Sequence, residues 1–364
     1  MKKRKKWLDV ARTFAVIAIV SNHAVSRVFD NGVDQYSEFV RQPWLSQLFK
    51  AIVTTFSWLG VPIFLMITGA LMIGRKYESK DDIKKFYKKS WLPLLIVTEV
   101  WSFFGYIFIT VQNSVPFNFE WFFGLLKTML FIDKVEFGLM WYMNMIICLY
   151  PLIPIFSVFI KRFSLKQIRV PFFIGLWMGF IFPTISKYVY IFTDTNIQSD
   201  LLSTYTYSSY LLYIIIGYFI SNDGLKKLKT RTICIGVTTT FILTVFLQFI
   251  GYANKHNLVT SYDSVGILII SICLFELFRR YCDNFYEKVM LFFTYMSNRA
   301  FAIYSIHIFF TETMFYYLKR KIVIYNQCVT TILYVLIPIS CALIVIMLLE
   351  KNKLIKRHIL MIKD

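Results

Sequence analysis

The feature that most constrains this chain is a succession of apolar segments separated by short, basic loops. Ten such segments lie near residues 11–28, 47–73, 91–111, 139–160, 170–186, 207–220, 232–250, 264–278, 298–317 and 329–349. A membrane-spanning helix needs about 17–25 predominantly apolar residues, and most of the ten segments reach that length. We therefore predict an all-α fold, a polytopic membrane bundle of about ten transmembrane helices.

The composition supports this class and excludes others. Hydrophobic residues make up 57% of the 364 residues and charged residues only 17%, whereas a soluble protein carries about 25% charge. The net charge is +19, but the basic residues sit in short loops and form no basic domain, so we do not expect nucleic acid as a partner. The six cysteines contain no CxxC pair, which argues against a metal site or a disulfide framework.

Lysine and arginine are distributed unequally between two sets of loops. Residues 1–10, 74–90, 161–169, 221–231, 279–288 and 350–364 hold 28 of them. The opposite loops, residues 29–44, 112–138, 187–206, 251–263 and 318–328, hold 8. Because short loops rich in Lys and Arg stay cytoplasmic, we predict that both termini are cytoplasmic. We expect one transmembrane domain, residues 1–349, and a short basic cytoplasmic tail, residues 350–364.

Ionisable residues interrupt the first apolar segment. Arg12 and His23 are eleven positions apart, so on an α-helix they share a face to within about 20° and lie about 16 Å apart along the axis. Ionisable groups at such depth are costly and are typical of a cavity or a proton path. Asp9 precedes Arg12 by three residues and can pair with it across one turn. The alternative is a snorkelling Arg12 and a His23 that only packs.

Other polar residues in apolar segments are further candidates for lining a cavity. Glu99 lies midway along its segment and has no cation three or four residues away, so it either pairs across helices or stays protonated. Tyr304 and His307 are one turn apart in a late segment, although an interfacial Tyr and a packing His explain them equally well. Thr68 and Gly69 end a stretch of small residues, which favours close helix packing.

Five patches, in order along the chain, resemble the acyltransferase 3 family of membrane acyltransferases. They lie at residues 8–23 (Asp9, Arg12, His23), 60–71 (Thr68, Gly69), 85–93 (Lys85, Lys88, Pro93), 139–143 (Trp141, Tyr142) and 297–307 (Tyr304, His307). This chain has Thr68 where the family usually has Ser, and no His before Trp141. Lys85 and Lys88 replace two arginines, which removes bidentate phosphate recognition.

The resemblance implies an activity, a donor and an acceptor. Members of the family transfer an acyl group, usually acetyl, from cytoplasmic acyl-CoA to a hydroxyl of an extracytoplasmic or lipid-linked cell-surface glycan. This chain resembles the stand-alone members, which lack a fused extracytoplasmic domain. We therefore expect an O-acetyltransferase type of enzyme with acetyl-CoA as donor, no metal, and a polysaccharide of the cell envelope as acceptor. The Lys-, Ile-, Phe- and Tyr-rich composition is typical of an AT-rich bacterial genome. We therefore expect a multi-pass protein of a bacterial cell membrane.

The same residues suggest roles in such a reaction. His23 can act as the general base, because its unperturbed pKa lies near neutrality, or it can carry the acyl group covalently. Arg12 offers a planar fork to the phosphates of CoA. Lys85, Lys88 and Lys89 form a cytoplasmic cluster that can meet the same phosphates, although a topology signal alone also explains them.

A transporter or flippase for a lipid-linked saccharide is the competing interpretation. A central His23 and a buried Glu99 would also serve such a carrier. In the acyltransferase interpretation, Trp141 is a candidate for lining the cavity, together with Glu99, Tyr304 and His307. The sequence shows no inverted repeat and no matched pair of broken helices, which argues against a carrier.

Overall fold

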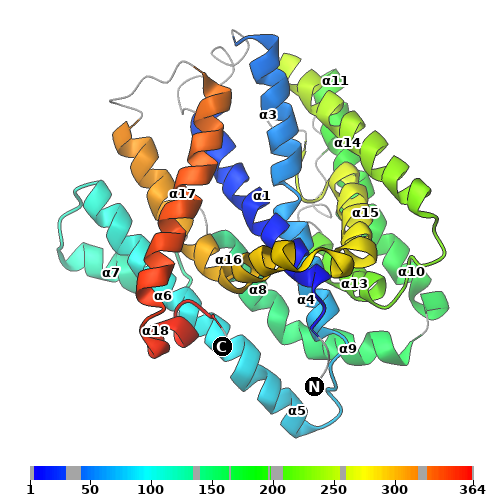
Figure 1. Cartoon of the computed structure of the whole chain (residues 1–364), viewed down its shortest axis with the longest axis horizontal. Helices are drawn as coiled ribbons and strands as arrows, with labels where there is room; N and C mark the ends of the chain where they lie inside the picture. Colours follow the sequence, from blue (N-terminus) through cyan, green and yellow to red (C-terminus); the bar gives the residue numbers. More distant parts are fainter. Residues whose placement is uncertain are drawn as a thin grey trace.

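A computed structural model describes residues 4–29, 42–133, 140–163, 165–195, 197, 208–254, 260–318 and 326–362 of the chain. Every regular element within these residues is a helix, which confirms the predicted all-α class. Figure 1 shows the helices gathered around α1, which runs through the middle of the bundle.

The helices follow the predicted segments closely. They are α1 (Trp7–Phe29), α3 (Trp44–Ser57), α4 (Gly60–Met72), α5 (Lys80–Phe86), α6 (Leu92–Gln112), α7 (Phe119–Met129), α8 (Met140–Leu149), α9 (Ile153–Arg162), α10 (Leu165–Leu176), α11 (Phe182–Thr193), α13 (Ser208–Ser221), α14 (Thr230–Ala253), α15 (Val265–Tyr281), α16 (Glu287–Thr313), α17 (Gln327–Leu349) and α18 (Lys353–His358). Each of the ten predicted apolar segments overlaps one or more of these helices.

Seven continuous helices of the described residues are long and apolar enough to cross a membrane. They are Trp7–Phe29, Trp44–Met72, Lys80–Gln112, Trp141–Arg162, Gln167–Thr193, Thr230–Ala253 and Gln327–Leu349. Helix α13 is apolar but shorter, α15 has 17 residues, and α16 carries Asn298, Arg299 and His307 within its 27 residues. The protein is therefore a multi-pass membrane protein, while the number of ten spans stays a prediction.

Helix α1 is enclosed by other helices along most of its length. It packs against α16, α4, α17 and α3, and its fully buried residues include Ala11, Ala15, Ala18 and Ala24. Small side chains allow helices in a membrane to approach closely. Asp9 and His23 consequently lie among packed helices, whereas Arg12 and Arg27, toward the two ends of α1, have side chains that are 26% and 41% exposed.

The tightest contact joins α4 to α13. A Cβ added to Gly69 would lie 1.8 Å from the carbonyl oxygen of Ile214, and one added to Gly217 would lie 2.2 Å from that of Met66. Both glycines are thus required for this approach of the two backbones. The packing role predicted for Gly69 is confirmed.

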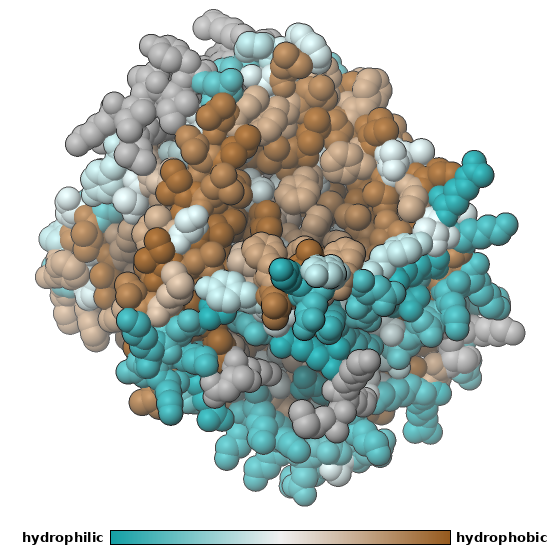
Figure 2. Space-filling model, in the orientation of Figure 1, coloured by the Kyte–Doolittle hydropathy of each residue, from teal (hydrophilic) through white to brown (hydrophobic). Residues whose placement is uncertain are grey.

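Hydrophilic side chains gather at one end of the molecule. Figure 2 shows a broad apolar surface that gives way to hydrophilic residues at the end where Figure 1 places both chain termini and α5. Residues 350–362, predicted as a tail, fold back onto the bundle there, because Leu360 and Ile362 are buried in the main apolar core. We call this region the basic end, and its cytoplasmic location stays a prediction.

Replacing Gly69 by Ala should lower the apparent Tm of the purified protein in detergent. Overpacking a core costs about 1–3 kcal/mol, and here the obstacle is the backbone at Ile214, which cannot rotate away. The matched control is Gly236→Ala in α14, where the added Cβ would make an ordinary 3.4 Å contact with Cys273 Sγ. Equal melting temperatures for the two variants would contradict this account of the α4–α13 contact.

Thiol labelling of single cysteines tests the orientation. Glu78 and Asn113 lie just beyond the two ends of the continuous helix Lys80–Gln112, and both are exposed. In a cysteine-free background, a membrane-impermeant reagent added to intact cells should modify Asn113→Cys and spare Glu78→Cys until the cells are permeabilised. Reversed labelling would invert the topology. Asn31, in the predicted outer loop 29–44, lies outside the described residues.

Candidate functional site

Asp9 is the centre of a polar network at the basic end of α1. It is only 2% exposed. Arg4 donates to both carboxylate oxygens, from Nε to Oδ2 and from Nη2 to Oδ1, each at 2.9 Å. The hydroxyl of Ser297 on α16 donates to Oδ1 at 2.7 Å. This carboxylate therefore has the paired, hydrogen-bonded environment that a buried charge requires.

Arg12 joins the same network from the next turn of α1. Its Nη1 donates to Ser297 Oγ at 2.7 Å and lies 3.7 Å from Asp9 Oδ1. The predicted pairing of Asp9 with Arg12 is thus present, but Arg4 makes the shorter, two-point contact. Sequence reasoning missed Arg4 because it lies five residues before Asp9, outside the helical i,i+3 and i,i+4 pattern, in a run of basic residues typical of a topology signal.

The basic end of α1 is also tied to other parts of the chain. Arg4 Nη2 donates to Asn298 Oδ1 at 2.8 Å, and the Trp7 backbone N–H donates to Asp283 Oδ1 at 2.8 Å. Asp283 lies between α15 and α16 and satisfies an amide at the start of α1 that has no partner within the helix. These bonds fix the position of α1 relative to α16 near Arg12.

His23 meets a second histidine on α16. The ring centroids of His23 and His307 are 5.4 Å apart, and His307 is fully buried. His307 Nδ1 lies 2.9 Å from the carbonyl oxygen of Ile303, which only accepts, so Nδ1 carries a proton and donates it here. Its Nε2 is buried without a hydrogen-bond partner among the described residues. In a neutral His307 ring, this nitrogen is the proton acceptor.

Helices α1 and α16 lie side by side and run in the same direction. Arg12 and His23, eleven residues apart, meet Ser297 and His307, which are ten residues apart. The predicted shared face of Arg12 and His23 is thus the face that α1 turns toward α16. The Arg12 guanidinium is hydrogen-bonded to Ser297, and its side chain remains 26% exposed near the basic end.

Aromatic rings continue from the histidine pair. Tyr304 lies 6.3 Å from His307 between ring centroids, and Tyr142 lies 5.6 Å from Tyr304. Trp141, the neighbour of Tyr142, lies 5.4 Å from Tyr262. The structure therefore brings Trp141, Tyr304 and His307, which the sequence singled out separately, into one cluster of rings. Phenol and indole groups combine an apolar face with a hydrogen-bonding tip.

An ion pair joins the same two helices beyond the histidines. Arg27 Nη2 lies 2.7 Å from Glu312 Oε1, and the guanidinium sits 5.1 Å from the centre of the Phe315 ring. Arg27 is one turn after His23, and Glu312 is five residues after His307. No local spacing rule connects Arg27 to Glu312, because the two residues lie on different helices nearly 300 residues apart.

Glu99 and the three lysines are not part of these contacts. Glu99 Oε2 is buried and has no hydrogen-bond partner in the described part of the chain. Lys85, Lys88 and Lys89, in α5 and the π turn Tyr87–Trp91 that follows it, are exposed. No hydrogen bond or ion pair between described residues joins them to Arg12. Among the described residues, no three His, Cys, Asp or Glu side chains are grouped to hold a metal ion.

One comparison with known proteins found a match. The model of the acyltransferase 3 family, described as an acyltransferase domain, matches residues 5–351. The matched range contains every residue of the Asp9 network except Arg4, and all of the ring cluster. Neither a curated protein nor a solved structure matches the chain.

Replacing Asp9 by Asn should destabilise the protein by about 2 kcal/mol, because hydrogen bonds to charged groups contribute about 1.5–3 kcal/mol and Arg4 is partly exposed. Asn keeps the size of the side chain but leaves two guanidiniums without their anion. The apparent Tm in detergent measures the loss. Asp81→Asn, an exposed acid in the first turn of α5, is the control, and an equal loss in both variants would contradict a special role for Asp9.

Proposed function

The chain belongs to the acyltransferase 3 family, and on that premise we propose that it is an O-acyltransferase of a bacterial cell membrane. It moves an acyl group, acetyl in the simplest case, from acyl-CoA at the cytoplasmic face to a hydroxyl of an extracytoplasmic or lipid-linked cell-surface glycan. The observation that carries this proposal is the pairing of His23 with His307 at 5.4 Å inside the bundle. Arg12 lies on the same face of α1, toward the basic end.

The donor approaches from the basic end. The phosphates of CoA need cations, and Arg12 presents a planar guanidinium there, 26% exposed. Lys85, Lys88 and Lys89 are exposed on α5 and on the turn after it, so they attract the anionic donor over the range of the Debye length, about 8 Å at physiological salt. The thin pantetheine arm then extends from Arg12 toward His23, which requires the apolar side chains packed between α1 and α16 to move aside.

The chemistry needs a proton acceptor beside the thioester carbonyl. The acceptor hydroxyl oxygen attacks that carbon while its proton passes to a His23 ring nitrogen, and the tetrahedral intermediate collapses with loss of the CoA thiolate. The free Nε2 of His307 gives the proton a second acceptor nearby. In the alternative sequence, His23 attacks first, releases the thiolate, and passes the acyl group to the hydroxyl in a second step.

The ring cluster supplies the surroundings for the acceptor. Tyr304 and Tyr142 follow His307 in a chain of ring contacts, and Trp141 lies next to Tyr142. Their hydroxyl and indole N–H groups can bind the oxygens of a sugar or of the developing oxyanion. Glu99 makes no contact with this cluster through a described hydrogen bond, so we assign it no step.

Replacing His23 by Ala should reduce acyl transfer by about 10²–10⁴-fold, the usual contribution of a general acid–base group. The assay measures thiol release from acyl-CoA and ester formation on the glycan, with purified protein in vesicles. His358→Ala in α18, an exposed histidine, is the control and should keep full activity. Near-normal activity of His23→Ala would exclude both proposed roles for this residue.

A second measurement separates the two chemical sequences. If the acyl group passes through His23, quenching during turnover of a labelled acyl-CoA should leave label on the wild-type protein and none on His23→Ala. If His23 acts only as the base, neither protein should retain label. The variant His307→Gln should keep part of the activity and shift its pH profile, because the second proton acceptor is lost. Movement of a lipid-linked saccharide without consumption of acyl-CoA would instead support the carrier.

A further inference from the structure

A short apolar helix, α7, follows α6 at the end of the bundle opposite the basic end. Asn118 Oδ1 accepts a hydrogen bond from the backbone N–H of Trp121 at 2.9 Å and so caps its first turn. Its 11 residues are too few to cross a hydrocarbon core of about 30 Å, because a helix rises about 1.5 Å per residue. Figure 1 shows α7 beside α6 at the edge of the bundle. It is therefore an apolar helix that does not span the membrane.

One face of α7 packs against the last two turns of α6. Trp121 Nε1 donates to Thr110 Oγ1 at 2.7 Å, and the Tyr106 hydroxyl donates to the carbonyl oxygen of Trp121 at 3.2 Å. A Cβ added to Gly124 would lie 2.3 Å from Tyr106 Oη, so a larger residue would have to displace this hydroxyl. Thr128, one turn farther, is buried. Helix α7 therefore runs back along α6 and turns Trp121, Gly124 and Thr128 toward it.

The opposite face of α7 is an exposed apolar stripe. Its members follow the spacing of one helical face and are between 44% and 75% exposed; they are Phe119, Phe122, Phe123, Leu126 and Leu130. We call them the α7 stripe. Burying one Phe or Leu side chain contributes about 1.5–3 kcal/mol relative to leaving it in water, so five such residues in water would be costly. The α7 stripe therefore requires an apolar environment.

The charged residues of α7 lie on a third side of the helix. Glu120 and Lys127 are both exposed, and they are seven residues apart, so they share one side. At about 100° per residue, this side lies about a quarter turn from the centre of the α7 stripe. Around the helix axis, α6 is thus on one side, the stripe on the opposite side, and the charges between them. A helix that lies in a membrane surface needs this arrangement, because it meets protein, lipid and water at once.

The contacts with α6 place α7 at the level of the membrane surface. Helix α6 has 21 residues and is about 30 Å long, the thickness of a hydrocarbon core. Thr110 and Tyr106, which hold α7, lie within about 10 Å of its last residue, Gln112, and interfacial helices bury their apolar face by about 5–10 Å. Tyr106 and Trp121 are also residue types that concentrate at membrane–water interfaces. Phe103, three residues before Tyr106, is exposed, so the lipid-facing surface of α6 continues up to α7.

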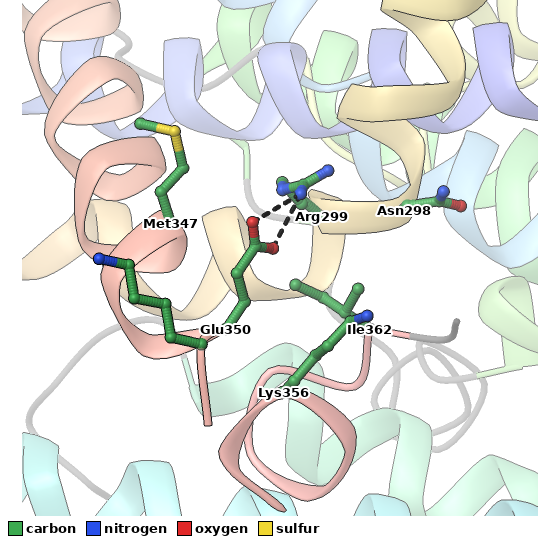
Figure 3. A pocket seen from close by; sticks show the side chains of 7 residues that line it. Asn298, Arg299, Met347, Glu350, Lys356 and Ile362 are labelled. Carbon is green, nitrogen blue, oxygen red and sulfur yellow. Dashed lines mark hydrogen bonds and ion pairs between the residues drawn. The ribbon is translucent and has the colours of Figure 1, made fainter. Parts of the chain in front are cut away.

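Helix α18, the short helix at the basic end, provides a contrast. Its residues Ile355 and Ile359 pack against the main apolar core. Figure 3 shows Lys356 of this helix near the ion pair that Arg299 forms with Glu350, at a polar pocket between α16, α17 and α18. Helix α18 thus turns its isoleucines into the protein, whereas α7 turns its stripe outward. An exposed apolar stripe is therefore not a general property of the short helices of this chain.

We propose that α7 is an interfacial helix whose stripe is embedded in the lipid leaflet opposite the basic end. The partner of the stripe is the upper part of the lipid hydrocarbon chains, while Glu120 and Lys127 reach water. The hydrogen bonds of Trp121 with Thr110 and Tyr106 join α7 to α6, so the membrane surface also sets the depth of the end of α6. This inference depends on neither the donor nor the acceptor of the proposed function.

The test measures fluorescence quenching of single labelled cysteines in the full-length protein, in a cysteine-free background and in nanodiscs that hold one copy each. Phe123→Cys and Leu126→Cys report on the stripe, and Lys127→Cys, the exposed neighbour of Leu126, is the matched control. One quencher is a lipid with a nitroxide near the top of its acyl chain, and the other is iodide in the buffer. Iodide is an ion and does not enter hydrocarbon.

The expected result is opposite behaviour of the two sides of α7. The ratio of quenching by nitroxide lipid to quenching by iodide should be about fivefold or more higher at Phe123→Cys and Leu126→Cys than at Lys127→Cys, because the stripe lies in hydrocarbon and the charged side in water. Phe119→Cys and Leu130→Cys, at the two ends of the stripe, should behave as the central sites do. With four sites on the stripe, one variant that fails to fold leaves the test intact.

Three other outcomes would overturn the inference. Equal quenching by iodide at the stripe sites and at Lys127→Cys would mean that the stripe faces water. Protection of the stripe from both quenchers in nanodiscs with one copy would mean that another segment of this chain covers it. Protection from both quenchers that appears only when two copies share a nanodisc would identify a second copy as the partner. In each of these cases the acyltransferase proposal would be unaffected, because it assigns no role to α7.

Discussion

The burial of Asp9 between α1 and α16 is the interaction on which the rest of the site depends. Two guanidiniums, from Arg4 and Arg12, and the hydroxyl of Ser297 converge on this carboxylate. Removing a charged group from water is costly unless partners replace the water, so the network forms only when both helices are in place. It thereby fixes the position of α1 along α16, and this position brings His23 to His307 two to three helical turns farther along.

The sequence predicts features that follow from the length of apolar segments and from the helical period. It does not predict which residues of different helices contact each other. Apolar length predicted the helices, and the 3.6-residue period predicted the shared face of Arg12 and His23. The partners on that face come from α16, nearly 300 residues away, and no local spacing rule connects His23 to His307 or Arg4 to Asn298. The family match agrees with the resemblance carried by the motifs.

Helix α16 shows how polar residues of a candidate site make a membrane span harder to recognise from hydropathy. This helix supplies Ser297 and Asn298 to the network, Arg299 to an ion pair with Glu350, and His307 to the histidine pair, and these residues interrupt its apolar run. A helix of this kind faces lipid poorly, and it packs against α1 and α17 instead. The polar residues of the candidate site thus lower the hydropathy of the helix that carries most of them.

The contact between α1 and α16, here called the seam, affects how well the membrane prevents the passage of protons. Charged groups stand at both of its ends, at Asp9 and at Arg27 with Glu312, and imidazoles lie between them. A continuous file of water along such a seam would conduct protons and discharge the membrane. The stretch between the Asp9 network and the histidines is instead filled by fully buried apolar residues, Ala15, Val16, Ala300 and Ile303. Packing of these side chains leaves no room for a continuous file of water along this stretch.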